Sequence, residues 1–162
     1  MKSNKNKRKK SIIVAVSGGM DPLHIGHVRL FQEAKKLGDK LIVILNNDNW
    51  LRAKKGYVFM REQERKEVLE ALACVDEVVL TRHSKNPKDM SVCKELLKIK
   101  PHIFAKGGDR HLGNLPGPEI KACQAIGCKM VFNIGKGGKV QSSSWLAQNF
   151  LHHFKNKNNL PG

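Results

Sequence analysis

Residues 12–27 read IIVAVSGGMDPLHIGH, and this stretch decides the fold. It begins with a continuous apolar run rich in β-branched side chains, which is typical of a strand buried on both faces of a parallel sheet. Two glycines follow. The apolar positions between residues 24 and 37 then recur with a helical period, which stops at Gly38. The stretch therefore predicts a buried strand, a glycine-containing turn and a helix.

The same alternation continues along the whole chain. Further strands are predicted at residues 41–45, 77–80, 102–105 and 129–134, and further helices at 60–75, 89–100, 116–126 and 142–154. This order predicts the fold class α/β, as a single Rossmann-like, doubly wound domain with a five-stranded parallel sheet and helices on both faces. Ligands of such sheets bind beyond the carboxyl ends of the strands, where this sequence has most of its loop glycines and serines.

Length and charge suggest how the chain is divided. A chain of 162 residues has room for one ordinary domain. We expect a basic, disordered arm at residues 1–10, the domain at 11–154 and a flexible tail at 155–162. The arm carries six basic residues and no acid, so the net charge is +16 with it and +10 without it. A nucleic-acid-binding module that uses this arm is the alternative function, but the arm has no aromatic residue to stack on bases.

Two further patterns bear on the compartment. No apolar run reaches the length of a membrane helix and no signal peptide is recognisable, so we expect a cytoplasmic protein without membrane contact. The cysteines contain no CxxC pair, which favours reduced, mostly buried thiols over disulfides or zinc. They are Cys74, Cys93, Cys123 and Cys128.

The turn after the first strand carries the candidate chemistry. It contains neither GxGxxG nor a GKS/GKT sequence, which excludes the dinucleotide fingerprint and the Walker loop. Helix N-termini attract phosphate, and the spacing of His24 and His27 puts both imidazoles on one helix face, with Gly26 leaving space beside them. Zinc would lack a third ligand nearby. The segment therefore predicts phosphate binding.

The HxGH sequence after a GxFD-like turn resembles the motif of the nucleotidyltransferase superfamily, which includes cytidylyltransferases and class I aminoacyl-tRNA synthetases. Met20 stands where the family usually has an aromatic residue. The synthetases are too large for this chain and need a KMSKS-type loop, which KDMSV at 88–92 resembles only superficially. The chain is similar instead to the short cytidylyltransferase-like enzymes over residues 12–150. Supporting segments are LGDKLIVILNND (37–48), RAKKG (52–56), EQERKEVLEALACVDEVVL (62–80), KPHIFAKGGDR (100–110) and VQSSSWL (140–146).

The resemblance implies an enzyme that transfers CMP or AMP from CTP or ATP to the phosphate of a small sugar, polyol or alcohol and releases pyrophosphate. Within the family, the KGGD loop is most like the adenylyltransferase domain that acts on heptose 1-phosphate, with glycerol-3-phosphate cytidylyltransferase close behind. Mg²⁺ would be held mainly by the triphosphate, with no protein ligand assigned. A homodimer is also implied.

The resemblance also implies roles for single residues. The catalytic residues are His24, His27, Arg65 and either Lys54 or Lys55. The alternative for Arg65 is a surface ion pair with Glu62 or Glu64, and the serines near residue 142 would also make an ordinary helix cap. Nucleotide or phosphate binding is expected of Ser17, Gly18, Gly19, Met20, Gly26, Lys106, Gly107, Gly108, Asp109, Ser142, Ser143 and Ser144.

Overall fold

A computed structural model describes residues 11–108, 110–135 and 142–157 of the chain. The expected basic arm and Asp109 lie outside the described residues. In chain order the elements are β1 (Ile13–Gly18), α1 (Ile25–Lys35), β2 (Lys40–Leu45), α2 (Asp48–Lys55), α3 (Glu62–Glu70), β3 (Glu77–Leu80), α4 (Cys93–Ile99), β4 (Ile103–Gly107), the 3-10 helix η1 (Leu112–Asn114), α5 (Gly117–Ile126), β5 (Lys129–Ile134) and α6 (Ser143–Lys157).

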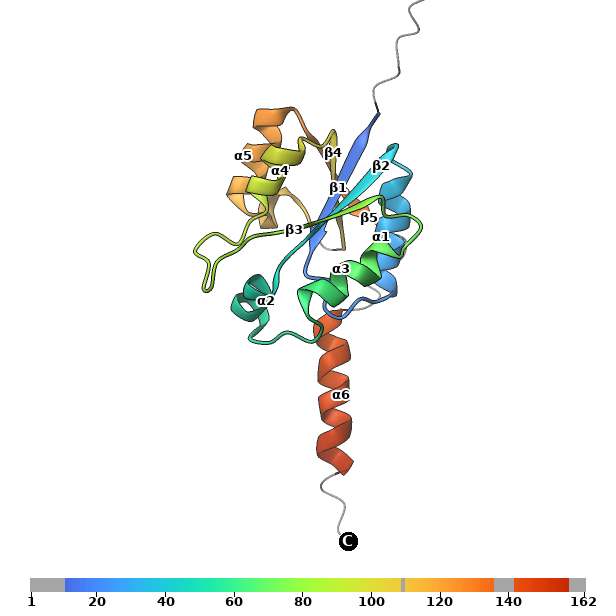
Figure 1. Ribbon diagram of the computed structural model, residues 1–162, viewed down its shortest axis with the longest axis vertical. Helices are drawn as coiled ribbons and strands as arrows, with labels where there is room; N and C mark the ends of the chain where they lie inside the picture. Colours follow the sequence, from blue (N-terminus) through green and yellow to red (C-terminus); the bar gives the residue numbers. More distant parts are fainter. Residues whose placement is uncertain (1–10, 109, 136–141, 158–162) are drawn as a thin grey trace, which may run out of the picture.

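The five strands form one sheet in the order β3-β2-β1-β4-β5 (Figure 1). All four strand pairs are parallel. The predicted α/β fold with a five-stranded parallel sheet is thereby confirmed. The chain order reverses between β1 and β4, and this switch point opens a crevice at the carboxyl ends of the strands, where such sheets bind ligands.

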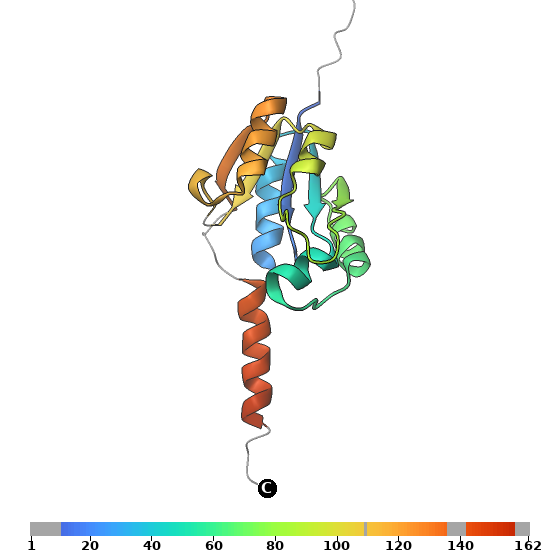
Figure 2. The same cartoon turned by 90° about the vertical axis from the view of Figure 1, so that its left-hand side faces the viewer.

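Helices cover both faces of the sheet (Figures 1 and 2). Because side chains alternate along a strand, Val14 and Val16 of β1 pack in one core with α1 and α3, whereas Ala15 packs in a second core with α4 and α5. The continuous apolar runs of the sequence thus serve two cores at once. This burial fixes β1 at the centre of the molecule and its carboxyl end at the crevice.

Helix α2 was not among the predicted helices. The segment DNWLRAKK, which forms α2, contains few apolar residues, and only Leu51 among them is buried. The helix depends on its ends instead: the Asn47 side chain accepts a hydrogen bond from the Trp50 N–H, and Gly56 ends the helix in the left-handed conformation. The predicted helix at 60–75 is also shorter than expected, since α3 ends at Glu70.

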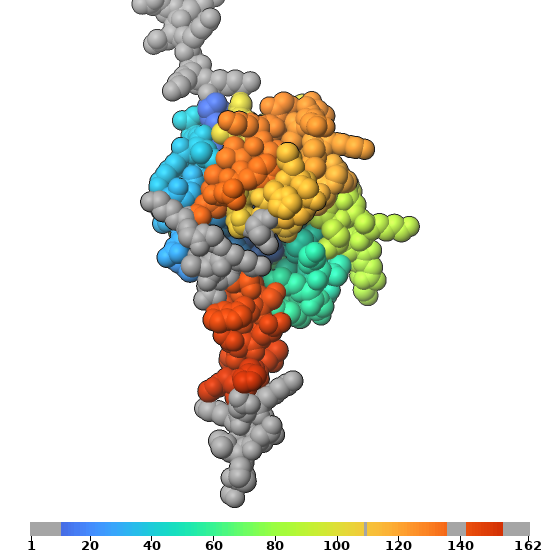
Figure 3. Space-filling model, turned by 180° about the vertical axis from the view of Figure 1, so that it is seen from behind, coloured from blue at the N-terminus to red at the C-terminus, as the bar shows by residue number. Residues whose placement is uncertain are grey.

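Helix α6 projects away from the sheet and its covering helices (Figures 1 and 3). Its backbone remains helical to Lys157, beyond residue 154, where the domain was expected to end. Among the described residues, no helix is both long and apolar enough to cross a membrane. All four cysteines are free thiols; Cys123 and Cys128 are buried, and Cys74 and Cys93 are half-buried.

Candidate active site

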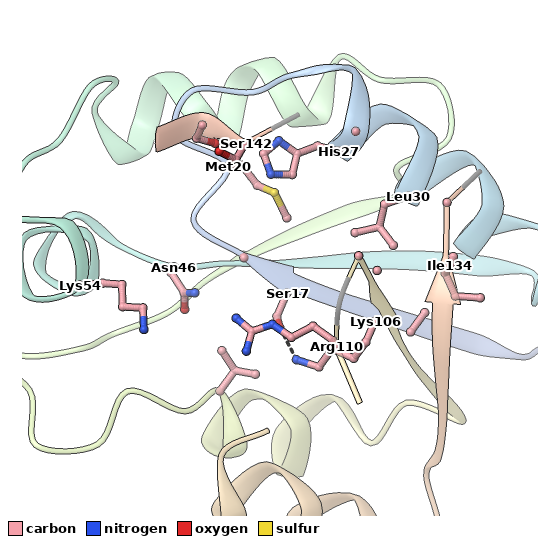
Figure 4. A pocket seen from close by; sticks show the side chains of 18 of the residues that line it. Ser17, Met20, His27, Leu30, Asn46, Lys54, Lys106, Arg110, Ile134 and Ser142 are labelled. Carbon is pink, nitrogen blue, oxygen red and sulfur yellow. Dashed lines mark hydrogen bonds between the residues drawn. The ribbon is translucent and has the colours of Figure 1, made fainter. Parts of the chain in front are cut away.

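A cavity of about 630 Å³ opens at the carboxyl ends of β1 and β4 (Figure 4). This volume is typical of a small-molecule site. We call one side the α1 wall, formed by His24, Gly26, His27 and Ser142–Ser144, and the opposite side the α5 wall, formed by Asn46, Val92, Lys106 and Glu119. The predicted location of the site, at the strand ends, therefore agrees with the position of the cavity.

The two histidines of the α1 wall are stacked, with ring centroids 3.8 Å apart. His24 is the N-cap of α1, and its Nδ1 accepts from the Gly26 N–H at 3.1 Å. The Nδ1 of His27 accepts in turn from the His24 N–H at 3.3 Å. Because both Nδ1 atoms accept, each neutral ring carries its proton on Nε2. The local fold thus fixes the tautomer of both rings and leaves both Nε2–H groups as donors.

The surroundings of these histidines favour the neutral form. Burial, and then the neighbouring His24 and Lys55, lower the pKa of His27 to about 3. Burial and Lys55 also lower the pKa of His24 below its ordinary value. At neutral pH, without a ligand, both rings are therefore uncharged hydrogen-bond donors.

The glycines of the turn make room for protein side chains rather than open space for a ligand. A Cβ atom on Gly26 would lie 2.9 Å from the His24 ring, one on Gly18 2.7 Å from the methyl group of Met20, and one on Gly19 2.7 Å from Leu51. The expected open space beside the histidines is thus filled by the His24 ring itself. Gly19 does not line the cavity, whereas Gly18, Met20 and Gly26 do.

Both lysines of α2 that the sequence left as alternatives line the cavity. The Nζ of Lys55 donates to the Asp21 carbonyl oxygen at 2.8 Å, and burial lowers its pKa. Lys54 is exposed and makes no hydrogen bond within the described part of the chain. The Lys54 ammonium is therefore free to bind an anionic ligand. Lys55 holds the turn after β1 through its bond to Asp21, and it also lines the cavity.

Arg65 occupies a different place from the one expected. Its side chain is 2% exposed and does not line the cavity. The guanidinium donates to the carbonyl oxygens of Gly19 (2.6 Å), Asn46 (2.8 Å) and Met60 (2.9 Å). It also pairs with Asp48 at 2.7 Å, and not with the Glu62 or Glu64 considered above. Arg65 thus cross-links the loops after β1 and β2 from behind.

Asp21 holds the same turn from its other side. Its carboxylate is fully buried and accepts from the backbone N–H groups of Phe59 and Met60, each at 2.7 Å. The peptide bond between Asp21 and Pro22 is cis. The turn that carries the histidines is therefore fixed by a carboxylate and a guanidinium together.

The α5 wall contains a buried ion pair. The Nζ of Lys106 lies 2.9 Å from a carboxylate oxygen of Glu119 and 3.1 Å from the Ser17 hydroxyl, and it sits 4.0 Å from the centre of the Phe104 ring. The Glu119 carboxylate also accepts from the Val92 N–H. Burial lowers the pKa of Lys106, and Glu119 opposes that shift. The charges on this wall are therefore largely compensated within the protein.

The three serines at the start of α6 make different contacts. The Ser142 hydroxyl accepts from the Trp145 N–H and so caps the helix. The Ser143 hydroxyl donates to the Pro22 carbonyl oxygen at 2.9 Å, which ties α6 to the histidine turn. Ser144 is exposed. All three serines line the cavity. The start of α6 therefore carries both a helix cap and residues at the candidate site, as the sequence suggested.

Several cavity residues were absent from the sequence-based set: Asn46, Trp50, Glu119 and Arg110. Asn46 directly follows the predicted strand 41–45, so its place at a strand end was a usable signal. Arg110 follows the predicted strand 102–105 within the quoted segment KPHIFAKGGDR, so the same signal applied to it, whereas Trp50 and Glu119 reach the cavity from α2 and α5 without a local pattern that marks them. The expected residues Gly107 and Gly108 line the cavity, and Asp109 lies outside the described residues.

The residues of the cavity do not form a magnesium site of their own. No group of three or more His, Cys, Asp or Glu side chains that could hold a metal is found in the described parts of the chain. Glu119 is the one described carboxylate that lines the cavity, and it is paired with Lys106. Mg²⁺ prefers several carboxylate, phosphate and water oxygens.

Comparison with known proteins agrees with this geometry. Residues 15–121 match the family described as cytidylyltransferase-like, and the chain belongs to this family. The predicted family is thereby confirmed.

Individual relatives are similar over parts of their length. The chain is 40% identical over 110 residues to the bifunctional protein HldE of Pelobacter propionicus, which is 67% of this chain and 21% of that protein. It is 39% identical over 105 residues to the FAD synthase of Thermococcus sibiricus, which is 64% of this chain and 68% of that protein. A lipopolysaccharide core biosynthesis protein of Thermoplasma volcanium GSS1 superposes with a TM-score of 0.64 at 27% identity, covering 79% of this chain and 100% of that one.

Proposed function

We propose that this chain transfers a nucleoside monophosphate from a nucleoside triphosphate to the phosphate of a small acceptor, with release of pyrophosphate. A phosphate oxygen of the acceptor forms a bond to the α-phosphorus, and the bond between that phosphorus and the bridging oxygen to the β-phosphate breaks. The observation that carries this proposal is the stacked pair of neutral histidines whose Nε2–H groups remain as donors.

The histidines stabilise charge in this mechanism and do not move protons. An acceptor phosphate is already anionic near neutral pH, so it needs no base. As the bond to the leaving group breaks, negative charge grows on the phosphate oxygens, and preorganised N–H donors stabilise it. Neutral imidazoles suit this role because they donate without a change of protonation state, and before substrate binds the pKa of His27, about 3, keeps its ring neutral.

The cations and serines position the substrates around this centre. The exposed ammonium of Lys54 is suited to the acceptor phosphate or the α-phosphate, and Lys55 adds positive charge from its place on the Asp21 carbonyl. Ser144, at the start of α6, adds a hydroxyl to the exposed helix N-terminus, which is suited to the terminal phosphates. Magnesium bound to the triphosphate would neutralise part of its charge. Arg65 acts as a positioning residue, through the loop carbonyls that it holds.

The comparisons favour ATP as the nucleotide. The name FAD synthase implies transfer of an adenylyl group by that relative. We therefore propose adenylyl transfer, with CTP as the nucleotide to test beside ATP. Nucleoside triphosphates are abundant in the cytoplasm, and we propose that the enzyme works there.

We also propose a homodimer that forms through α6. Trp145 and Leu151 are exposed on this projecting helix. Residues 140–154 contain no Lys, Arg, Asp or Glu, although the chain as a whole has a net charge of +16. A second copy can approach this helix without the repulsion that the rest of a strongly basic surface would produce.

A pyrophosphate-release screen tests the activity. ATP, CTP, GTP and UTP are each combined with phosphorylated sugars, polyols, alcohols and FMN in the presence of magnesium. We expect release that requires both a nucleotide and an acceptor, with ATP the best nucleotide. Absence of release with every pair, from a protein that binds ATP in a calorimeter, would contradict the proposed function.

A further inference from the structure

Arg110 is a cation of the cavity that the proposed mechanism does not use. It follows β4, it is exposed, and it lines the cavity. Its Nη1 donates to the Asn114 carbonyl oxygen at 3.3 Å, which is long for a hydrogen bond of this kind. Within the described part of the chain, no carboxylate forms an ion pair with Arg110. The guanidinium therefore keeps most of its five N–H donors for a ligand.

Lys106, which lies near Arg110, is by contrast already paired. Its Nζ lies 2.9 Å from Glu119, and its side chain is only 10% exposed. Burial lowers the pKa of Lys106 most; Glu119 opposes that shift, and the positive charge of Arg110 adds to it. Glu119 is the one described carboxylate that lines the cavity, so it can compensate only one of the two cations. The described residues on this side of the cavity therefore keep one positive charge without a counter-ion.

Arg110 lies on the side of the cavity opposite the histidines. In Figure 4, its side chain lies beside Ser17 and Asn46. Lys54 is on the same side of the end of β1, and His27 is on the other side. Two cations from distant parts of the chain, one on α2 and one after β4, thus line the same side of the cavity. An anionic group bound there would meet both of them.

The α1 wall has a cation of its own for the triphosphate. Arg29 belongs to α1, the helix that begins at the histidines, and it lines the cavity. If the triphosphate lies against the histidines, as the proposed function requires, Arg29 lies on its side. Arg110, on the opposite side, is then left for the second substrate.

We propose, on the basis of the proposed function, that Arg110 binds the phosphate of the acceptor together with Lys54 and places it for attack on the α-phosphorus. A guanidinium suits this task because its planar donors can hold two oxygens of one phosphate. The third terminal oxygen of the phosphate is then left to attack. The bound phosphate also supplies the counter-charge that this side of the cavity lacks. Arg110 is thus an acceptor-binding residue, and Lys106 on the same side is a structural one.

Steady-state kinetics test this assignment with the wild type and Arg110→Gln, using the acceptor that gives the fastest pyrophosphate release in the screen. Glutamine stays polar but removes the charge and the paired donors. We expect kcat/KM for the acceptor to fall about 10- to 100-fold, since hydrogen bonds between charged groups are lost. KM for the nucleotide should stay unchanged. Arg110→Lys should recover only part of the loss, because an ammonium restores the charge but not the planar fork of donors.

The matched control is Arg82→Gln. Arg82 is also an exposed arginine, but it follows β3 and does not line the cavity. Both variants lower the net charge by one, so equal losses of activity would show a general charge effect and overturn the assignment. Arg110→Gln should not lower the Tm, because it removes an exposed cation from the vicinity of Lys106. Should Arg110→Gln fail to fold, Arg110→Lys takes its place.

Binding of inorganic phosphate separates this proposal from the proposed function. The protein is saturated with a non-hydrolysable ATP analogue and titrated with inorganic phosphate in a calorimeter. We expect phosphate to bind, and Arg110→Gln to weaken its binding at least about tenfold while Arg82→Gln leaves it unchanged. This result would support the anion site even if no pyrophosphate is ever released.

Three outcomes would overturn the assignment. The first is a wild type that does not bind phosphate beside the ATP analogue. The second is an Arg110→Gln variant with a weaker Kd for the ATP analogue and an unchanged Kd for phosphate, which would assign Arg110 to the triphosphate. The third is normal kcat/KM for the acceptor in Arg110→Gln, which would leave the proposed function in place without this role for Arg110.

Discussion

On the α1 wall, no described residue bonds to the Nε2 of His24 or His27, whereas on the α5 wall Lys106 and Glu119 are bonded to each other. The first wall therefore offers donors that only a ligand can use. On the second wall Lys106 and Glu119 already neutralise each other, and Arg110, which also lines the cavity, acts electrostatically on this pair. This difference puts unused hydrogen-bond donors on one side of the cavity and an already paired lysine and glutamate on the other.

The largest expected effect comes from breaking the compensation on the α5 wall. Lys106→Met leaves the Glu119 carboxylate buried without its partner. Loss of one member of a buried pair costs about 3–5 kcal/mol of unfolding free energy, measured by denaturant titration. The double variant with Glu119→Gln should recover most of the loss, because no uncompensated charge remains. A single variant as stable as the wild type would show that the charges are not compensating each other.

Removing a donor from the α1 wall comes next. His27→Ala should lower kcat about 10²–10³-fold while the protein still folds, because one preorganised donor to the developing charge is lost. Pyrophosphate release measures the effect. Near-normal turnover in a folded variant would exclude the assigned role.

A matched control exists for the other histidine. His111 caps η1 as His24 caps α1, with its Nδ1 accepting from the Gly113 N–H at 3.2 Å, but it is exposed and does not line the cavity. His24→Ala and His111→Ala each lose a histidine cap. Only His24→Ala should lose pyrophosphate release. Equal losses of activity in both variants would show that His24 acts only as a helix cap.

Arg65 joins the loops after β1 and β2, since it donates to the carbonyl oxygens of Gly19 and Asn46. Lysine cannot reproduce this fork of donors, so Arg65→Lys should cost about 2–3 kcal/mol of stability. If Arg65 acts by positioning, KM for both substrates should rise together with the loss of stability. A variant of normal stability with a large fall in kcat alone would favour a direct catalytic role instead.

Because His27 is neutral in the folded protein, the unfolding free energy should depend on pH. In the unfolded chain His27 takes up a proton near pH 6.5, whereas in the folded protein its pKa is about 3. Its contribution to stability is therefore complete above pH 6.5 and is lost as the pH falls toward 3. Between pH 6.5 and 5.5 the loss is about 1 kcal/mol. His27→Gln should remove this part of the slope in denaturant titrations, and an unchanged slope would contradict it.

The smallest effect on folding is expected at α6, outside both walls. Leu151→Glu replaces an exposed side chain, so the unfolding free energy should change by no more than about 0.5 kcal/mol. If the helix joins two copies, the same variant should shift the mass measured by light scattering from dimer to monomer. A wild type that is monomeric at all concentrations would contradict the proposed dimer.

Much of the molecule could be predicted because it depends on local patterns. The apolar runs marked all five strands, and the spacing of His24 and His27 placed both rings on one helix face. Helix α2 was missed because its single buried residue, Leu51, gives no period, and its caps take effect only once the neighbouring loops are in place.

By itself, the sequence determined the five strands and most of the helices between them, the end of a parallel sheet at which a ligand binds, and the histidine pair, since these follow from periodic patterns and short spacings along the chain. Only the tertiary structure decided that Arg65 holds loops from behind, that Lys106 meets Glu119, and that Asn46 is left with an unpaired oxygen. These depend on which groups packing brings together and which it leaves without a partner, and no local pattern records that.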